Sequence, residues 1–381
     1  MDKEKLTDLI RNILWAVLLI AALIYGIASG HWKAFIILAV LFVSIKSVIL
    51  LMQLKLHKTA KELKETLESQ GRPSYVPKPS EIEAMQNKAN AISDHIKKQC
   101  PPQRCLFFAI CQKESPITPF DSKLGGVPYW DNAKPYPTDA NGRPMAMVIQ
   151  INFEKHPHVD PLPQSGMLQF FITSDETMLE EGYGMSFDDP TSQANCRVVY
   201  HETVNRDIDI KLLEQYPRCE DLENSPVKGE YPLWALPGDS CINRTCNEFE
   251  QLFADAFKQL YGDKLETPYF DDYLKKILPE EHRDEVDDAL VMGDNPMYYG
   301  PTWKNFQMLG FPAFEQYDER PEGCRCDTLL LQIPTIENSN ESQDGNWCTI
   351  WGDCGSARLF INADDLRRRD FSQVYFEFQC Y

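Results

Sequence analysis

The chain has 381 residues, of which 43% are hydrophobic and 25% charged, an ordinary composition for a globular protein. Its formal net charge is −19; residues 1–58 hold seven Lys/Arg and three Asp/Glu, so they carry +4 and the rest of the chain carries −23. So acidic a body argues against nucleic-acid binding, which requires a cationic surface, and it favours a basic protein partner.

Two apolar stretches begin the chain. Residues 13–29 are uncharged, and residues 32–52 carry only two lysines. Their lengths lie near the lower limit of the roughly 17–25 residues that cross a bilayer, so residues 1–56 are predicted to form a transmembrane helical hairpin. The hairpin would contact the lipid bilayer through residues 13–52. Lys and Arg flank it, and only Lys33 lies in the connector, which predicts a multi-pass protein of the inner or plasma membrane with both termini and the main domain in the cytoplasm.

A stalk and a Pro-rich linker are predicted next, over residues 57–79, because the end of this stretch contains three prolines. Ser80 and Glu83 then have the spacing of a capping box, which predicts a helix that ends near Lys98. The remainder, residues 80–381, is predicted to be one domain.

Runs rich in β-branched and aromatic residues predict strands on both sides of the domain. These runs are residues 105–111, 147–153, 167–173, 196–201, 330–333 and 358–361. Helical spacing in residues 247–261 and 280–292 predicts a helical insertion between the strand-rich parts.

Two parts of the domain match each other in three blocks that occur in the same order. The matched blocks are residues 124–128 with 309–312, 147–151 with 330–333, and 166–172 with 355–361. They predict an internal repeat of residues 124–172 and 309–361. The predicted fold class is therefore α+β, built from duplicated strand-rich units with a helical insertion and preceded by two transmembrane helices.

No familiar catalytic signature is present. His201-Glu202 lacks the second His of a zinc-protease helix, because position 205 is Asn205. The twelve cysteines include no Cys-x2-Cys pair, so we expect free thiols and no metal. We likewise expect no cofactor and no catalytic residue, which makes an enzyme the less favoured interpretation.

Polar residues inside apolar strands provide the candidate binding site, because such groups must find partners or face a cleft. Gln150 and Gln332 occupy matching places in the repeat, as do Gln169 and Arg358. The candidate ligand- or partner-binding residues are Gln150, Gln169, Gln332, Trp351, Asp353 and Arg358.

Two interpretations of this polar set remain open. If the two halves pack about a pseudo-twofold axis, the set converges on one concave pocket, with Trp130 and Trp351 as apolar walls. Alternatively, the set is structural: both glutamines bond to the backbone, and Arg358 pairs with Asp353.

Several blocks resemble the YwqG-like proteins over roughly residues 80–381. These blocks include LGGVPYW (124–130), MVIQINF (147–153), VVYHE (198–202), IWGDCGSARLFI (350–361) and DLRRRDFS (365–372). The resemblance implies a duplicated α+β fold of strand-rich halves. It implies no settled activity, although members of the family have been suggested as immunity proteins in bacterial toxin systems.

The sequence thus favours a non-enzymatic function: a membrane-anchored cytoplasmic protein-binding module, with an immunity-type protein for a cationic toxin domain as the specific candidate. One alternative is an enzyme or small-ligand-binding protein that uses a pocket between the duplicated halves. Another is a structural membrane-associated protein.

Overall fold

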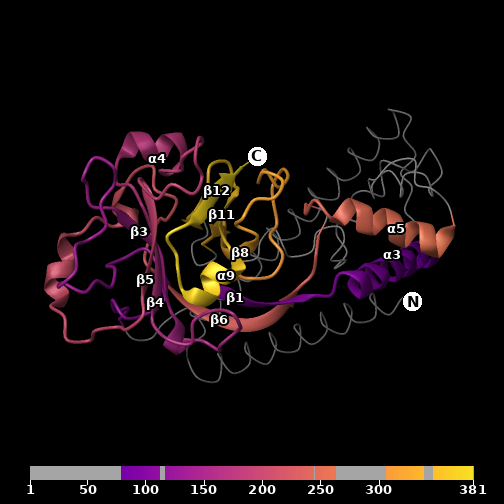
Figure 1. Ribbon diagram of the computed structural model, residues 1–381, viewed down its shortest axis with the longest axis horizontal. Helices are drawn as coiled ribbons and strands as arrows, with labels where there is room; N and C mark the ends of the chain where they lie inside the picture. The colour runs from indigo at the N-terminus through magenta and orange to yellow at the C-terminus, as the bar shows by residue number, and fades with distance from the viewer. Residues whose placement is uncertain (1–78, 112–115, 244, 263–305, 339–345, 381) are drawn as a thin grey trace, which may run out of the picture. The chain divides into compact units, whose positions relative to one another are not determined.

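The computed structural model of the protein describes residues 79–111, 116–243, 245–262, 306–338 and 346–380. They belong to one compact unit, Pro77–Tyr381 (Figure 1).

The helices are α3 (Pro79–Gln99), α4 (Glu176–Gly182), α5 (Phe249–Tyr261) and α9 (Ala363–Arg368), with short 3-10 turns η1 (Phe153–Lys155), η2 (Ile210–Gln215) and η3 (Cys219–Asp221). The strands are β1 (Gln103–Ile110), β2 (Lys123–Leu124), β3 (Ala146–Asn152), β4 (Met167–Ile172), β5 (Cys196–His201), β6 (Tyr231–Ser240), β7 (Gln307–Met308), β8 (Thr328–Pro334), β9 (Ile336–Glu337), β10 (Trp347–Thr349), β11 (Ser356–Ile361) and β12 (Val374–Gln379).

Ten of these strands form one sheet in the order β12-β11-β8-β7-β1-β6-β2-β3-β4-β5. Every named pair in it is antiparallel. Val, Ile, Leu and Phe dominate these strands, as expected for residue types that pack well on a pleated surface. β9 and β10 pair separately as a two-stranded ribbon.

The strand order has a two-fold pattern about the central pair β1 and β6. One half-sheet runs β6-β2-β3-β4-β5, and the other runs β1-β7-β8-β11-β12. The first part of the unit supplies β1 to β5, and the second part supplies β6, β7, β8, β11 and β12. β6 joins the half that contains β2 to β5, whereas β1 pairs with β7 and β6 and joins the other half. Each half therefore begins with a strand from the other part. This arrangement is the one that the predicted duplication would produce if the two copies exchanged their first strands.

The two halves also repeat local geometry. Gln150 pairs with Gln169 across β3 and β4, and Gln332 pairs with Arg358 across β8 and β11. Each of the two matched glutamines accepts a backbone N–H through its Oε1 at 2.9 Å, from Tyr129 in one half and from Ala313 in the other.

The turns after β2 and β7 correspond as well. Gly125 and Gly126 have φ of 58° and 72°, and Leu309 and Gly310 have φ of 63° and 76°. By their φ angles, the structural counterpart of Leu309 is therefore Gly125, and that of Gly310 is Gly126. A leucine occupies a left-handed position that the other half gives to glycine.

The sheet curls so that its two end strands approach each other. The rings of Phe170 on β4 and Phe376 on β12 lie 5.0 Å apart between centroids. The Phe376 N–H donates to the carbonyl of Pro190, just before β5, at 2.9 Å. The core between the curled faces contains side chains such as Phe108, Ile151 and Leu331. Burying each large apolar side chain contributes about 1.5–3 kcal/mol.

A second, smaller core lies between α3 and α5, which pack side by side (Figure 1). Ile92 and Ile96 of α3 contact the phenylalanine face of α5, whose members Phe249, Phe253 and Phe257 recur every four residues. This spacing places them on one side of the helix.

The predicted fold class requires correction. The described residues form one nearly closed antiparallel sheet with few helices, rather than separate α+β units. No helix in the described part of the chain is both long enough and apolar enough to cross a bilayer. The two transmembrane helices and the multi-pass membrane localisation are therefore not supported. The predicted spans, residues 13–52, lie outside the described residues, as do the linker at 57–78 and the predicted helix at 280–292.

Candidate functional site

Gln150 lies at the centre of a fully bonded buried network. Its Oε1 accepts from the Tyr129 N–H at 2.9 Å and from Gln169 Nε2 at 3.1 Å. Its Nε2 donates to the carbonyls of Pro119 at 2.8 Å and Asp121 at 2.6 Å. A glutamine amide has two donors and two acceptor positions, so all of its bonding capacity is used. None of it is left for a ligand.

His201 closes the same network. Both Gln169 amide hydrogens already donate, to the Tyr129 carbonyl and to Gln150 Oε1. The Gln169 Oε1 must therefore accept the 2.9 Å bond to His201 Nε2, which makes Nε2–H the donor. Burial lowers the pKa of His201 from 6.5 to about 4, so this imidazole is neutral near pH 7. The rings of Tyr129 and Trp130 enclose it at 5.0 and 4.9 Å.

Arg358 is the centre of a second buried network, in the other half-sheet. Its Nε donates to Glu377 Oε1 at 2.7 Å. Its Nη1 donates to the Ala313 carbonyl at 2.8 Å, to Glu315 Oε2 at 3.0 Å and to Ser356 Oγ at 2.6 Å. Arg358 is completely buried, so these contacts replace the water that its guanidinium would otherwise bind.

The charges of this network are enclosed rather than offered to solvent. Burial raises the pKa of Glu377, against the opposing effect of the Arg358 charge. Among the described residues, Arg358 Nη2 and Glu377 Oε2 have no hydrogen-bond partner. Removing one member of such a pair costs about 3–5 kcal/mol, which is the behaviour of a structural element.

The structure brings the predicted site residues together in two pairs, Gln150 with Gln169 and Gln332 with Arg358, and not in one cluster. Gln150 on β3 and Gln332 on β8 are separated by four strands in the sheet order. Asp353 is exposed on the turn before β11 and does not pair with Arg358, whose carboxylate partners are different residues. Trp351 is fully buried, with its ring 4.9 Å from that of Tyr183. Gln150 and Gln169 therefore belong to one buried network, and Arg358 belongs to another.

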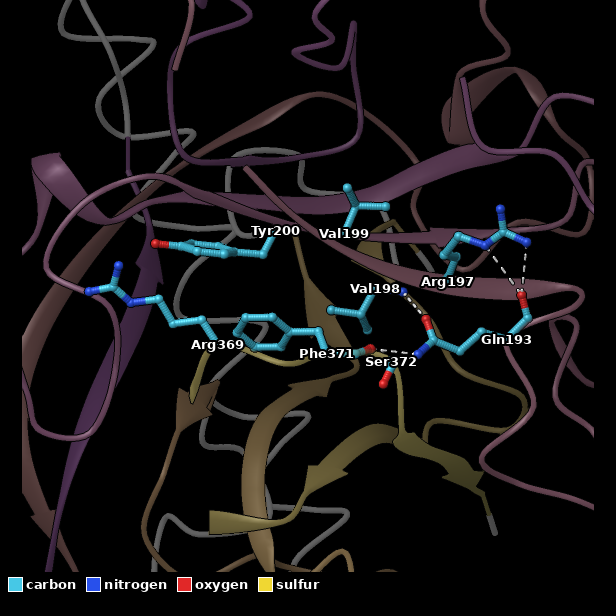
Figure 2. A pocket seen from close by; sticks show the side chains of 8 residues that line it. All are labelled: Gln193, Arg197, Val198, Val199, Tyr200, Arg369, Phe371 and Ser372. Atoms are coloured by element: carbon cyan, nitrogen blue, oxygen red, sulfur yellow. Dashed lines mark hydrogen bonds between the residues drawn. The ribbon is translucent and has the colours of Figure 1, made fainter. Parts of the chain in front are cut away.

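A pocket does lie between the two halves, at the place where the ends of the sheet approach. We call it the seam pocket; it is a shallow hollow that opens widely to solvent, with a volume of about 420 Å³. Figure 2 shows the side chains that line it, from β5 and the residues before it and from the segment that follows α9. The lining residues are Gln193, Arg197, Val198, Val199, Tyr200, Arg369, Phe371 and Ser372.

The side chain of Gln193 joins the two sides of the seam. Its Oε1 accepts from the Val198 N–H of β5 at 2.7 Å, and its Nε2 donates to the Phe371 carbonyl at 2.7 Å (Figure 2). The amide group thus bonds the end strand β5 to the segment that leads into β12, as a peptide group of an intervening strand would.

Two guanidinium groups lie at opposite ends of the pocket (Figure 2). Arg197 comes from β5, and its Nε and Nη2 donate to the Gln193 carbonyl at 3.4 and 3.2 Å. Arg369 follows α9, and its Nη1 lies 3.1 Å from Glu202 Oε1. The Arg369 and Glu202 side chains are 42% and 75% exposed, so this ion pair is a weak surface contact.

The backbone of Arg369 is unusual. Asn362 caps the start of α9 by accepting from the N–H groups of Asp364 and Asp365, and Arg369 ends the helix with φ of 61° and ψ of 31°. Glycine is the usual residue in this left-handed position, because other L-residues pay a steric cost there. The chain places an arginine there instead, at the mouth of the pocket.

Aromatic side chains form the apolar part of the lining. The rings of Tyr200 and Phe371 lie 5.3 Å apart with an angle of 46° between their planes. The Tyr200 hydroxyl donates to the Ser165 carbonyl at 2.8 Å. Burial raises the pKa of Tyr200, which keeps this hydroxyl protonated and uncharged at neutral pH. Val198 lies between the two guanidinium groups, beside these rings (Figure 2).

The lining consists of amide, guanidinium, hydroxyl, aromatic and aliphatic side chains. None of its residues is a His, Cys, Asp or Glu, so the lining itself supplies no general base. One carboxylate stands close by: Asp370 accepts from the Ser372 N–H at 3.0 Å, and its bonds to Ser372 lower its pKa. Asp370 is therefore ionised at neutral pH.

The sequence interpretation missed the seam pocket, although part of its signal was present. Arg367, Arg368 and Arg369 form an arginine run in a strongly acidic chain, and Tyr200 interrupts an aliphatic strand. The pocket itself depends on residues far apart in the chain, so no local pattern predicts it.

Other features of the described residues are less suited to a ligand. The hollow beside Cys100 and Cys241, near α3 and α5, has a volume of about 10 Å³, room for a single water molecule. All twelve cysteines have free thiols. Within the described ranges, no group of three metal-ligating side chains is close enough to hold a metal ion. Trp234 and Leu236, on one face of β6, are 52% and 47% exposed.

Comparison with known proteins adds a family but no activity. A family model described as a domain of unknown function, DUF1963, matches residues 122–380. No functionally curated protein matches the chain. The matched range contains β2 to β12, and thus both sides of the seam pocket.

Proposed function

The chain belongs to the DUF1963 family, and we propose that it is a small-ligand-binding protein whose ligand occupies the seam pocket. The observation that carries the proposal is a pocket of about 420 Å³ lined from both half-sheets by aromatic and cationic side chains. Ligand pockets commonly measure roughly 300–1,000 Å³ and combine an apolar lining with a few polar groups.

The position of the pocket supports this function. The pocket lies where β5 and the segment before β12 meet, so a ligand there would contact both halves of the sheet at once. A ligand that binds the pocket only when the two ends of the sheet are in contact would stabilise the folded chain.

The protein-binding module stays a second prediction. The net charge of −19 supports a basic protein partner, since an acidic surface attracts cationic proteins. We also propose that the family is the one of the YwqG-like proteins, because the blocks 124–130, 147–153, 198–202, 350–361 and 365–372 all lie inside the matched range.

The proposal is tested by blocking the pocket. Ser372 is exposed and lines the pocket, whereas Gln373 is exposed but does not line it. We expect Ser372→Trp to fill the pocket without disturbing the core, and Gln373→Trp to serve as the matched control.

The measurement is mass spectrometry of small molecules that copurify with the full chain. We expect a stoichiometric small molecule with the wild type and with Gln373→Trp, and its loss with Ser372→Trp. The same small molecule bound to all three chains would show that it occupies another place, and the proposal would then be wrong.

A further inference from the structure

We infer that the ligand of the seam pocket is a small amphipathic anion, with a carboxylate, sulfonate or phosphate group on an apolar body, and that Arg369 binds its charge. This inference rests on the proposed function, because it specifies the ligand of the same pocket.

The charge of the lining has one sign. Arg197 and Arg369 are its only ionisable groups that are charged at neutral pH, in a chain whose net charge is −19. Both guanidinium groups retain N–H donors beyond their bonds to the Gln193 carbonyl and to Glu202. Hydrogen bonds from guanidinium to an oxyanion are among the strongest in proteins.

Arg369 can exchange its present partner for a ligand. Its contact with Glu202 is a single exposed ion pair, which contributes about 0–1 kcal/mol at most. Glu202 does not line the pocket. The Arg369 stem passes Phe371 and its guanidinium lies at the outer end of the pocket (Figure 2), where its side chain is 42% exposed and an anion can reach it. Glu202 therefore competes with the ligand for Arg369 and, without a ligand, holds the guanidinium at the mouth of the pocket.

The rest of the lining requires an apolar body. Tyr200 and Phe371 present tilted rings 5.3 Å apart, and Val198 lies beside them. The Tyr200 hydroxyl already donates to the Ser165 carbonyl. A sugar-like or otherwise polar body would find few partners there, whereas an aromatic or branched aliphatic body would cover the rings.

Two fluorescent probes separate the two parts of this inference. Anilinonaphthalene sulfonate carries an anionic group on an aromatic body, and phenylnaphthylamine has the same aromatic body without the charge. Titration of the full chain with each probe gives two affinities, and Ser372→Trp shows which fluorescence change comes from the seam pocket.

Arg369→Asn is the decisive variant, because Asn tolerates the left-handed backbone of this position. We expect it to weaken sulfonate binding roughly ten-fold, the loss of one charge-assisted bond, and to leave the affinity for the neutral amine nearly unchanged. Glu202→Gln should strengthen sulfonate binding about three-fold by releasing Arg369.

Arg367→Asn is the matched control. It removes the same charge from the same helix, but Arg367 pairs with Asp364 and does not line the pocket. Both affinities should stay at their wild-type values.

The outcomes distinguish the two levels of the proposal. Suppose that both probes bind, that Ser372→Trp blocks both, and that Arg369→Asn changes neither affinity. The seam pocket is then a binding site, and the inference that its ligand is an anion is wrong. If Ser372→Trp leaves both affinities unchanged, or the wild type binds neither probe, the seam pocket is not the binding site and both proposals fall.

Discussion

At the scale of single residues, Gln150 and Arg358 illustrate how a polar side chain inside an apolar strand can serve the fold alone. Gln150 uses every donor and acceptor of its amide on the protein itself. Arg358 places its charge between Glu315 and Glu377, with no exposed surface. A buried group with all partners inside the protein stabilises one arrangement of the strands, because any other arrangement leaves it unpaired.

His201 carries the clearest consequence for pH at this scale. Its pKa is lowered from 6.5 to about 4 by burial, so the unfolded chain binds its proton more readily than the folded chain. Stability is therefore complete above pH 6.5 and falls as the pH drops from 6.5 toward 4. Between pH 7.5 and pH 5 the loss from this one histidine should be about 2 kcal/mol.

We expect His201→Gln to reduce this loss, because an amide can donate to Gln169 Oε1 without titrating. Urea unfolding of both chains at pH 7.5 and pH 5 measures the difference. His156, whose pKa is also lowered to about 4 by burial, provides a background that both chains share. Equal losses for the two chains would contradict the assignment of the effect to His201.

At the scale of elements, α9 shows a residue that is placed at a local cost. Its start is capped by Asn362, and its end is the left-handed Arg369. An L-residue with a side chain costs about 1–2 kcal/mol in that conformation. Such strain occurs most often where a side chain is needed for function, and here the side chain belongs to the lining of the seam pocket.

Arg369→Gly should therefore change the free energy of unfolding by no more than about 0.5 kcal/mol. The strain it relieves is offset by the greater freedom of glycine in the unfolded chain and by the lost surface ion pair with Glu202. Arg368→Gly is the comparison, one residue earlier and helical: it should cost at least about 1 kcal/mol and lose the contact with buried Asp365. Denaturant unfolding of the wild type and both variants measures these changes in the free energy of unfolding. An equal loss of stability in the two variants would mean that the backbone of Arg369 is not strained.

At the scale of the whole described unit, the exchange of β1 and β6 and the closure of the seam make the two halves depend on each other. Each half-sheet needs a strand from the other part of the chain to complete it. At the far ends of the sheet, the side chain of Gln193 supplies the bond between β5 and the segment before β12. The two halves are thus joined at the centre by strand pairing and at the seam by side chains.

Gln193→Ala should lower the free energy of unfolding by about 1–3 kcal/mol, because the buried Val198 N–H and the Phe371 carbonyl lose their partner. Hydrogen exchange of the Val198 amide should become faster, while that of Val199, whose residue pairs with Gln169 of β4, stays slow. Ser192→Ala is the neighbouring control. Unchanged stability and unchanged exchange in Gln193→Ala would show that the seam closes without this side chain.

The sequence alone predicted the elements that have strong local signals. β5 occupies Cys196–His201 as predicted, because a run of β-branched and aromatic residues favours a strand wherever it packs. The cap of α9 is likewise a local interaction, because the Asn362 side chain accepts from N–H groups of the first turn. The central strand β6 went unpredicted, since Pro232, Pro237 and Gly238 weaken its local pattern.

The tertiary structure alone decided what these elements build. β6 is a strand because it pairs with β1 over eight residues, which compensates for its prolines. The partners of Arg358 are Glu315 and Glu377 rather than the nearby Asp353, because burial and register select partners, not closeness in sequence. Arg197 and Arg369 meet at one pocket only because the sheet curls until its ends approach. That curl is a sum of strand pairings over the whole unit, which no local stretch of sequence specifies.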